Sequence, residues 1–204
     1  MGYPPEHPHE SRGAPTRRSR AQAPHLRQKT AGRPGVRAAV TPTYFSPDVA
    51  EFLRILASHR VRYLVVGGEA VIHYGYARLT GDIDVYYESA PENAERLFAS
   101  LRDFWSGSIP GIVDAGELII PGTIIQFGVP PNRIDLLNQI DGVSFDECWR
   151  NRTETNVPAP GGDVQVIFIG LTELIKNKET SDREKDRDDL RFLRRASRRE
   201  GPQS

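Results

Sequence analysis

Residues Tyr63–Tyr87, YLVVGGEAVIHYGYARLTGDIDVYY, form the stretch that decides the fold. The almost wholly apolar run Val61–Val66 predicts a central strand covered on both faces. The pair Gly67-Gly68 ends this strand, and a short helix over Glu69–Tyr74 follows it. A second strand, Ile83–Tyr87, comes after a brief connection that carries polar residues. The stretch therefore predicts a strand, a helix and a second strand, with a glycine corner at the first junction.

On either side of this stretch, helical and strand patterns alternate without regular βαβ repetition. Ser46, Pro47 and Asp48 predict a helix start, because serine caps, proline suits the first helical position and aspartate complements the helix dipole. This alternation predicts an α+β or mixed α/β fold, with a mostly antiparallel sheet flanked by helices. The other predicted elements are helices over 46–59, 89–101, 173–180 (capped by Thr172) and 183–195, a hairpin of strands 117–120 and 123–129 turning at Pro121-Gly122, strands over 133–137 and 164–169, and an ambiguous segment over 145–155.

The beginning of the chain differs in composition from the rest. Residues 1–40 contain six prolines, eight Arg or Lys and two acids, a net charge of +6 against −6 for residues 41–204. With few large aliphatic side chains to bury, residues 1–41 are predicted to be a disordered basic tail. Such a tail could bind nucleic acid, or it could be a solvated extension or an over-extended gene start, since Met1 is the only methionine. We expect one folded domain over residues 42–197 and a flexible C-terminus over 198–204.

Composition narrows the class of protein. The chain has 38% hydrophobic and 26% charged residues, and no apolar run approaches the ~20 residues of a membrane helix. The N-terminus lacks the apolar core of a secretory signal. Cys148 is the single cysteine, so no internal disulfide can form. We therefore expect a cytoplasmic protein that does not use the membrane as a partner.

Two aspartates, Asp82 and Asp84, begin the second strand of the opening stretch. Residues two apart in a strand point to the same side, so both carboxylates face away from Ile83 and Val85, about 6–7 Å apart at the backbone. A bare pair of this kind repels itself, whereas a divalent cation such as Mg²⁺ removes the repulsion. The pair alone is weak evidence, because such a D-x-D sequence also arises by chance at exposed strand ends.

Two further features strengthen this interpretation. Gly67 and Gly68 would let the backbone approach a triphosphate closely, although a tight turn alone would also require glycine. Asp135 lies between apolar neighbours in the predicted strand 133–137, which places it on the face opposite the core. It is either the third acid of a site that holds two metal ions or an ordinary solvent-facing residue.

The pattern of Gly67-Gly68, Arg78, Thr80, Asp82 and Asp84 resembles the nucleotidyltransferase superfamily built on the DNA polymerase beta type core. More narrowly, it is similar to the minimal prokaryotic branch that includes the AbiEii toxins. The segment LTELIKNKETSDREKDRDDLRFL agrees with that branch at Lys178, Arg183, Lys185, Asp186, Asp189 and Leu190.

The resemblance implies roles for most of these residues. Asp82, Asp84 and Asp135 would bind Mg²⁺ or Mn²⁺, and Gly67-Gly68 would line the phosphates of an NTP. Lys178 would contact the phosphates, with Asp186 orienting it. From their charge alone, Lys178, Arg183 and Lys185 could neutralise a triphosphate, or they could belong to an exposed, charged helix pair. Arg78 and Thr80 could contact phosphate or shape the connection, and Arg194, Arg195, Arg198 and Arg199 are expected to be solvated.

The predicted activity is therefore the transfer of an NMP from an NTP to an acceptor hydroxyl, with release of pyrophosphate. The resemblance favours RNA, especially a tRNA 3′ end, or a protein as acceptor. It also implies a toxin–antitoxin or phage-defence setting with a cognate antitoxin. The competing hypothesis is a catalytically silent protein of the same fold that binds RNA or a partner.

Overall fold

The computed structural model describes residues 45–130 and 132–200, without the side chains of residues 199 and 200. All the described residues belong to one compact unit. The predicted basic tail, residues 1–41, lies outside the described residues, as do residues 201–204 of the predicted flexible C-terminus.

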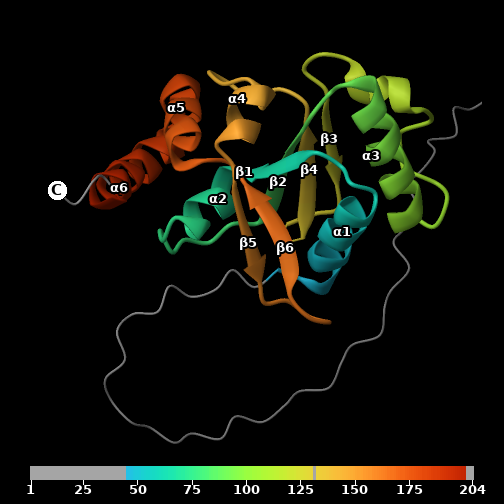
Figure 1. Ribbon diagram of the computed structural model, residues 1–204, viewed down its shortest axis with the longest axis horizontal. Helices are drawn as coiled ribbons and strands as arrows, with labels where there is room; N and C mark the ends of the chain where they lie inside the picture. The colour runs from blue at the N-terminus through green and yellow to red at the C-terminus, as the bar shows by residue number, and fades with distance from the viewer. Residues whose placement is uncertain (1–44, 131, 201–204) are drawn as a thin grey trace, which may run out of the picture. The chain divides into compact units, whose positions relative to one another are not determined.

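A six-stranded mixed sheet forms the centre of this unit, in the order β3-β4-β2-β1-β6-β5 (Figure 1). The β1–β2, β3–β4 and β5–β6 pairs are antiparallel, whereas β2–β4 and β1–β6 are parallel. The prediction of a mixed, mostly antiparallel sheet is therefore confirmed. The strands are β1 Tyr63–Val66, β2 Asp82–Tyr87, β3 Ile124–Phe127, β4 Arg133–Leu137, β5 Thr153–Val157 and β6 Val164–Phe168.

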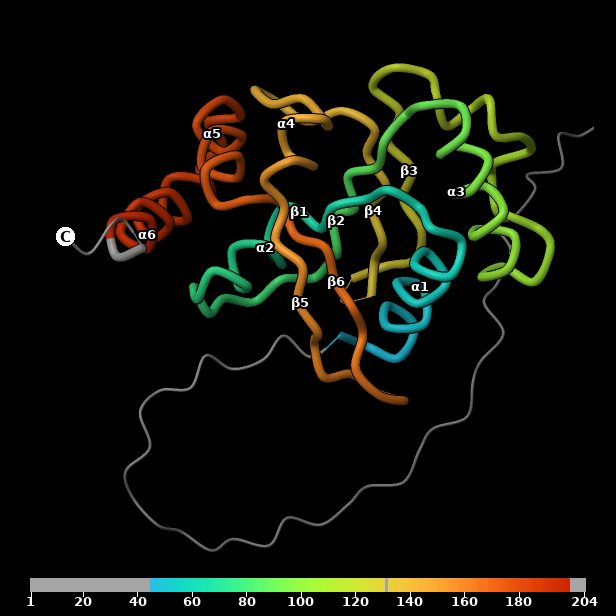
Figure 2. The backbone as a smooth tube through the Cα atoms, in the orientation of Figure 1, coloured from blue at the N-terminus to red at the C-terminus, as the bar shows by residue number. Residues whose placement is uncertain are grey.

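Six α-helices and one 3₁₀ helix surround the sheet within the described residues. Helix α1 packs against α3 and β6, and α2 packs against β1 and β2, while α5 and α6 pack against each other (Figure 2). None of the helices in residues 45–130 and 132–200 is both long and apolar enough to cross a membrane. The helices are α1 Pro47–Ser58, α2 Gly67–His73, α3 Pro91–Phe104, η1 Ala115–Ile119, α4 Phe145–Arg150, α5 Leu171–Ser181 and α6 Glu184–Glu200.

The start of α1 follows the sequence prediction. Ser46 accepts a hydrogen bond from the backbone N–H of Val49 at 3.3 Å, and Pro47 and Asp48 occupy the first turn. The capping serine satisfies an N–H group that has no partner inside the helix. This local chemistry fixes the start of helix α1.

The predicted hairpin at Pro121-Gly122 is wrong. The segment before it forms the 3₁₀ helix η1, which begins with a capping box between Asp114 and Glu117. The side chains of Asp114 and Glu117 bond to backbone N–H groups that would otherwise have no partner at the start of the helical turn. This capping stabilises a helical turn where the sequence pattern predicted a strand over 117–120. Strand β3 pairs instead with β4, the next strand along the chain.

Two other boundaries differ from prediction. Helix α5 begins at Leu171 with Gly170 as its N-cap, two residues before the predicted start at Glu173 with Thr172 as the cap. The N–H of Leu174 already bonds to the carbonyl of Gly170 at 2.9 Å. Helix α6 continues to Glu200, beyond the predicted end near residue 195. The ambiguous segment 145–155 divides into α4 and the start of β5.

The hydrophobic core determines which face of β2 is free for chemistry. Ile83 and Val85 are buried, whereas Asp82 and Asp84 lie on the opposite side and keep some exposure. Since alternate strand residues point to opposite faces, burial of the two apolar side chains holds both carboxylates on one side. The core thereby orients the acids. Its largest fully buried side chains are Tyr63, Tyr87, Phe52, Phe168, Leu53, Leu56, Leu64, Leu97, Leu101, Leu118, Leu136 and Ile169.

Candidate active site

The parallel strands β2 and β4 bring the three predicted aspartates together. Asp84 lies opposite Asp135 in the register of this pair, and Asp82 lies opposite Arg133. Residues at these four positions share one face of the sheet. Asp135 is buried, with only 5% of its surface exposed, so it is not an ordinary solvent-facing residue.

Arg133 is the residue of this cluster that the sequence reasoning missed. Its Nε donates to Asp135 Oδ1 at 2.8 Å, and its Nη2 donates both to Asp135 Oδ2 at 2.9 Å and to Asp82 Oδ2. Gln126 of β3 adds a hydrogen bond to Asp135 at 3.2 Å. The position of Arg133, two residues before Asp135 in a predicted strand, was the signal that could have found it.

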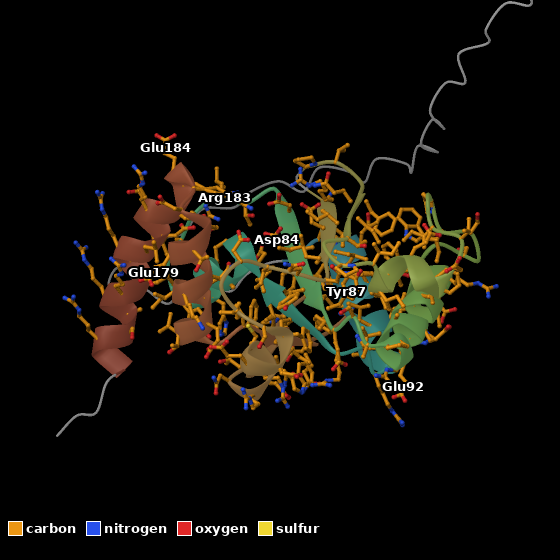
Figure 3. All side chains as sticks on the ribbon, turned by 90° about the horizontal axis from the view of Figure 1, so that it is seen from above. Asp84, Tyr87, Glu92, Glu179, Arg183 and Glu184 are labelled. Carbon is orange, nitrogen blue, oxygen red and sulfur yellow. The ribbon has the colours of Figure 1, made fainter. Side chains whose placement is uncertain are left out.

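The carboxylate of Asp84, unlike those of Asp82 and Asp135, accepts no hydrogen bond from Arg133. Burial and the negative charges of Asp82 and Asp135 raise its pKa to about 6. A cation close to such a carboxyl group would stabilise its charged form and lower its pKa. Figure 3 shows Asp84 near the junction of α5 and α6, from which Arg183 extends.

The glycine corner exists to accommodate Asp84. Gly67 has a φ of +62°, and a Cβ atom there would lie 1.9 Å from Asp84 Oδ2. A Cβ on Gly68 would lie 2.8 Å from both Arg78 Nη2 and Thr80 Oγ1. Both glycines therefore leave space that the site itself fills, and a tight turn alone does not account for them.

Thr80 and Arg78 shape the connection into β2. Thr80 Oγ1 donates to the backbone oxygen and to Oδ1 of Asp82, at 3.1 and 3.2 Å. Arg78 Nε lies 3.6 Å from Asp189 Oδ1 of α6. Thr80 thus fixes the orientation of Asp82, and Arg78 ties the connection to the last helix.

Lys178 lies in a buried ion cluster between α5 and α6. Its Nζ is 2.7 Å from Asp186 Oδ1 and 2.8 Å from Asp189 Oδ2. Burial raises the pKa of Asp186, but hydrogen bonds from Lys178 and Ser181 outweigh burial and leave that pKa below its usual value. Asp186 accepts a hydrogen bond from Nζ, whereas Asp189 contacts Nζ as an ion pair. A lysine ammonium has three donors, so Lys178 can also donate to another acceptor.

A cleft of about 410 Å³ joins these groups. Of the predicted site residues, all but Thr80 line it, and Arg183 and Lys185 are exposed at its edge. The acids of β2 and β4 thus open into a space bordered by basic residues of the α5–α6 region. The cleft is also lined by residues that sequence reasoning did not select: Val66, Ile124, Gln126, Arg133, Leu137, Gln139, Ile140, Asp141, Asn177 and Ser181.

The donor set suits a hard divalent cation. Carboxylate oxygens are preferred by Mg²⁺ and Mn²⁺, and Asp82, Asp84 and Asp135 supply three carboxylates on one face. The space beside Gly67 keeps the Asp84 carboxylate in the cleft. Across residues 45–130 and 132–200, no three acidic, histidine or cysteine side chains already converge as a preformed metal site. The three carboxylates fit a divalent cation in their chemistry and lie on one face, but Arg133 lies between two of them and binds their oxygens.

The family model described as "Nucleotidyltransferase of unknown function (DUF6036)" matches residues 48–193. The chain belongs to this family. The nucleotidyltransferase resemblance of the sequence is therefore confirmed at the level of the family, whereas the AbiEii branch stays a prediction. The DUF6036 match includes β2, β4 and the α5–α6 region, so every residue of the candidate site lies inside it.

A search of curated proteins gave no match. Among solved structures, the chain is similar to an antigenic nucleotidyltransferase-like protein from Paracoccidioides brasiliensis, with 16% sequence identity and a TM-score of 0.45. The similarity covers 75% of this chain and 78% of that protein.

Proposed function

We propose that this chain transfers an NMP from an NTP to an acceptor hydroxyl in a metal-dependent reaction that releases pyrophosphate. The observation that carries the proposal is the meeting of three carboxylates, from two adjacent strands, with a basic wall in one cleft. A polyanionic substrate bound with divalent cations needs both kinds of group. Membership of a nucleotidyltransferase family supports the same reaction class.

Asp82, Asp84 and Asp135 are the proposed ligands of Mg²⁺ or Mn²⁺. When bound, the metal would polarise the attacking hydroxyl and stabilise charge on the departing pyrophosphate. Thr80 holds the first of these carboxylates in place through its hydroxyl. Gly67 leaves the space that the second occupies.

The phosphates of the NTP would lie between the glycine corner and the α5–α6 region. Gly67 and Gly68 present backbone without side chains to the cleft, and Arg183 and Lys185 present positive charge. Lys178 can direct a remaining donor to a phosphate oxygen while its two aspartates hold it in position. Positioning and electrostatics would supply most of the catalysis, as in phosphoryl transfer generally.

RNA is the acceptor that we propose first, with a tRNA 3′ end foremost and a protein hydroxyl second. The sequence resemblance supports this choice and also a toxin role, with a cognate antitoxin, in the cytoplasm. The exposed arginines in the second half of α6, Arg191, Arg194, Arg195 and Arg198, would suit a polyanionic acceptor.

The proposal is tested by titrating each NTP with Mg²⁺ into the full chain and measuring heat of binding. The double variant Asp82→Ala with Asp84→Ala should lose metal-dependent NTP binding, because two of three proposed ligands are gone. Asp188→Ala, which removes an exposed acid on α6, is the matched control and should bind as the wild type does. If no NTP binds to the wild type, the chain is instead a silent protein of this fold.

A further inference from the structure

The guanidinium of Arg133 lies between two of the proposed metal ligands. It makes two hydrogen bonds to Asp135 and one to Asp82, so a single side chain joins β4 to β2. The arginine is partly exposed, with 28% of its side-chain surface accessible, and it lines the cleft. A guanidinium held in this fork geometry neutralises carboxylates as a cation would.

The oxygens that Arg133 binds are the same ones that a metal would need. Both carboxylate oxygens of Asp135 accept a hydrogen bond from it, and Gln126 shares one of them. A divalent cation bound to these oxygens would lie within a few ångströms of a unit positive charge, and like charges at that separation repel strongly. Asp84 differs, since among the described residues no side chain donates a hydrogen bond to its carboxylate.

We propose that Arg133 is the resident counter-cation of the metal-free site and that it must release Asp135 before a divalent metal can take all three aspartates. Arg133 thereby sets the metal affinity of the site and is a positioning residue. This inference rests on the proposed function, because it concerns the same three ligands.

A released guanidinium of Arg133 could move into the cleft, which this side chain already lines. Arg133 is the first residue of β4, so its side chain borders the open end of the strand rather than the core. The same cleft carries the proposed phosphate positions, and a guanidinium binds phosphate through paired hydrogen bonds. Metal entry and phosphate binding would then favour the same displaced position of Arg133.

A permanent structural role for Arg133 predicts the opposite effect on metal binding. If the arginine only aligns Asp82 with Asp135, removing it would let the two carboxylates separate, and metal affinity would fall. If it competes with the metal, removing it would leave the aspartates without a counter-cation, and affinity would rise. The sign of the change therefore separates the two roles.

The test measures Mn²⁺ binding to the full chain without nucleotide. The electron paramagnetic resonance signal of free Mn²⁺ reports how much of the ion is bound. We expect Arg133→Met to bind Mn²⁺ at least about tenfold more tightly than the wild type, since one competing charge is removed. Its melting temperature should be lower without metal and should rise more when Mn²⁺ is added. Arg102→Met, which removes an exposed arginine in the last turn of α3 and away from the cleft, should match the wild type.

Each other result has a definite meaning. Equal or weaker Mn²⁺ binding by Arg133→Met would overturn the competition but leave the proposed function standing. No Mn²⁺ binding by either protein, or tight binding that survives Asp84→Asn in the Arg133→Met variant, would overturn both. If the variant does not fold, a crystal structure of the wild type with Mn²⁺ decides: both bonds from Arg133 to Asp135 persisting beside a bound metal would contradict the inference.

Discussion

Gly67 is the residue on which the geometry of the acid cluster depends most closely. Its φ of +62° favours glycine, and the missing side chain leaves room for Asp84 Oδ2. Any other residue would have to adopt a left-handed backbone and displace the carboxylate. A side chain at position 67 would therefore cost free energy twice, through backbone strain and through displacement of the Asp84 carboxylate.

We predict that Gly67→Ala destabilises the fold by more than the ~1–2 kcal/mol expected for backbone strain alone. It should also weaken Mn²⁺ binding, because Asp84 must move. Gly107→Ala is the matched control, since Gly107 has a φ of +101° but nothing within 4 Å of an added Cβ. Urea unfolding measures the first effect, and equal losses for the two variants would show that Asp84 does not constrain Gly67.

Glu69, in the first turn of α2, is a further acid beside the cluster. Its Oε2 is buried and has no hydrogen-bond partner among the described residues. Burial raises its pKa to about 7, with Arg78 opposing the rise and Asp82 and Asp84 adding to it. The folded protein therefore keeps a proton on Glu69 at pH values where the unfolded chain has lost it.

This pKa gives a pH dependence of stability with a definite sign. Between the usual value of 4.5 and about 7, the folded state binds more protons, so the contribution of Glu69 to stability falls as pH rises across this window. Glu69→Gln should be more stable than the metal-free wild type at pH 8, by on the order of 1 kcal/mol, with a smaller difference at pH 5.

The measurement is urea unfolding of both proteins at the two pH values. Glu51→Gln, at an exposed position of α1, is the control and should follow the wild type at both. A difference between Glu69→Gln and the wild type that does not change with pH would contradict the buried, protonated state of Glu69.

At the scale of the elements, α5 and α6 depend on the buried cluster around Lys178. The exposed fractions of the side chains of Lys178, Asp186 and Asp189 are 5%, 5% and 1%. Charges so far from water are tolerated only when they are paired, and removing one partner leaves the others uncompensated. The cluster joins the two helices, and through Arg78 it also joins the connection that leads into β2.

We predict that Lys178→Met destabilises the protein by about 3–5 kcal/mol, because it leaves two buried aspartates without their counter-charge. Lys176→Met, which removes an exposed lysine paired with Glu147, should cost less than about 1 kcal/mol. Adding Asp186→Asn and Asp189→Asn to Lys178→Met should recover part of the loss. Chemical denaturation measures all three, and no recovery would mean that packing, not charge, explains the effect.

The elements also show what could be predicted from the sequence. Strand periodicity placed Asp82 and Asp84 on one face, and the apolar neighbours of Asp135 predicted its strand. The pairing of β2 with β4 joins residues about fifty positions apart, and no local pattern encodes a long-range pairing. The spacing of Arg133 and Asp135 predicts that they share a face of one strand, but the bond from Arg133 to Asp82 depends on the β2–β4 register.

At the scale of the whole molecule, the strand order assembles the site from three separated segments. Strands β1 and β2 with the glycine corner supply two acids, and β4 supplies the third acid and Arg133. Helices α5 and α6 supply other residues that line the cleft. Nearly all the predicted site residues reach one cavity although they span residues 67–186.

The most direct test of the central claim is transfer of label from an α-³²P-labelled NTP, with Mg²⁺, to total cellular RNA by the full chain. We predict labelled RNA with the wild type, none with the double variant Asp82→Ala and Asp84→Ala, and unchanged labelling with Asp188→Ala. Parallel reactions with cellular protein identify the second acceptor class. Labelling of either acceptor that persists in the double variant, or no labelling with any NTP, would contradict a metal-dependent nucleotidyltransferase site in this cleft.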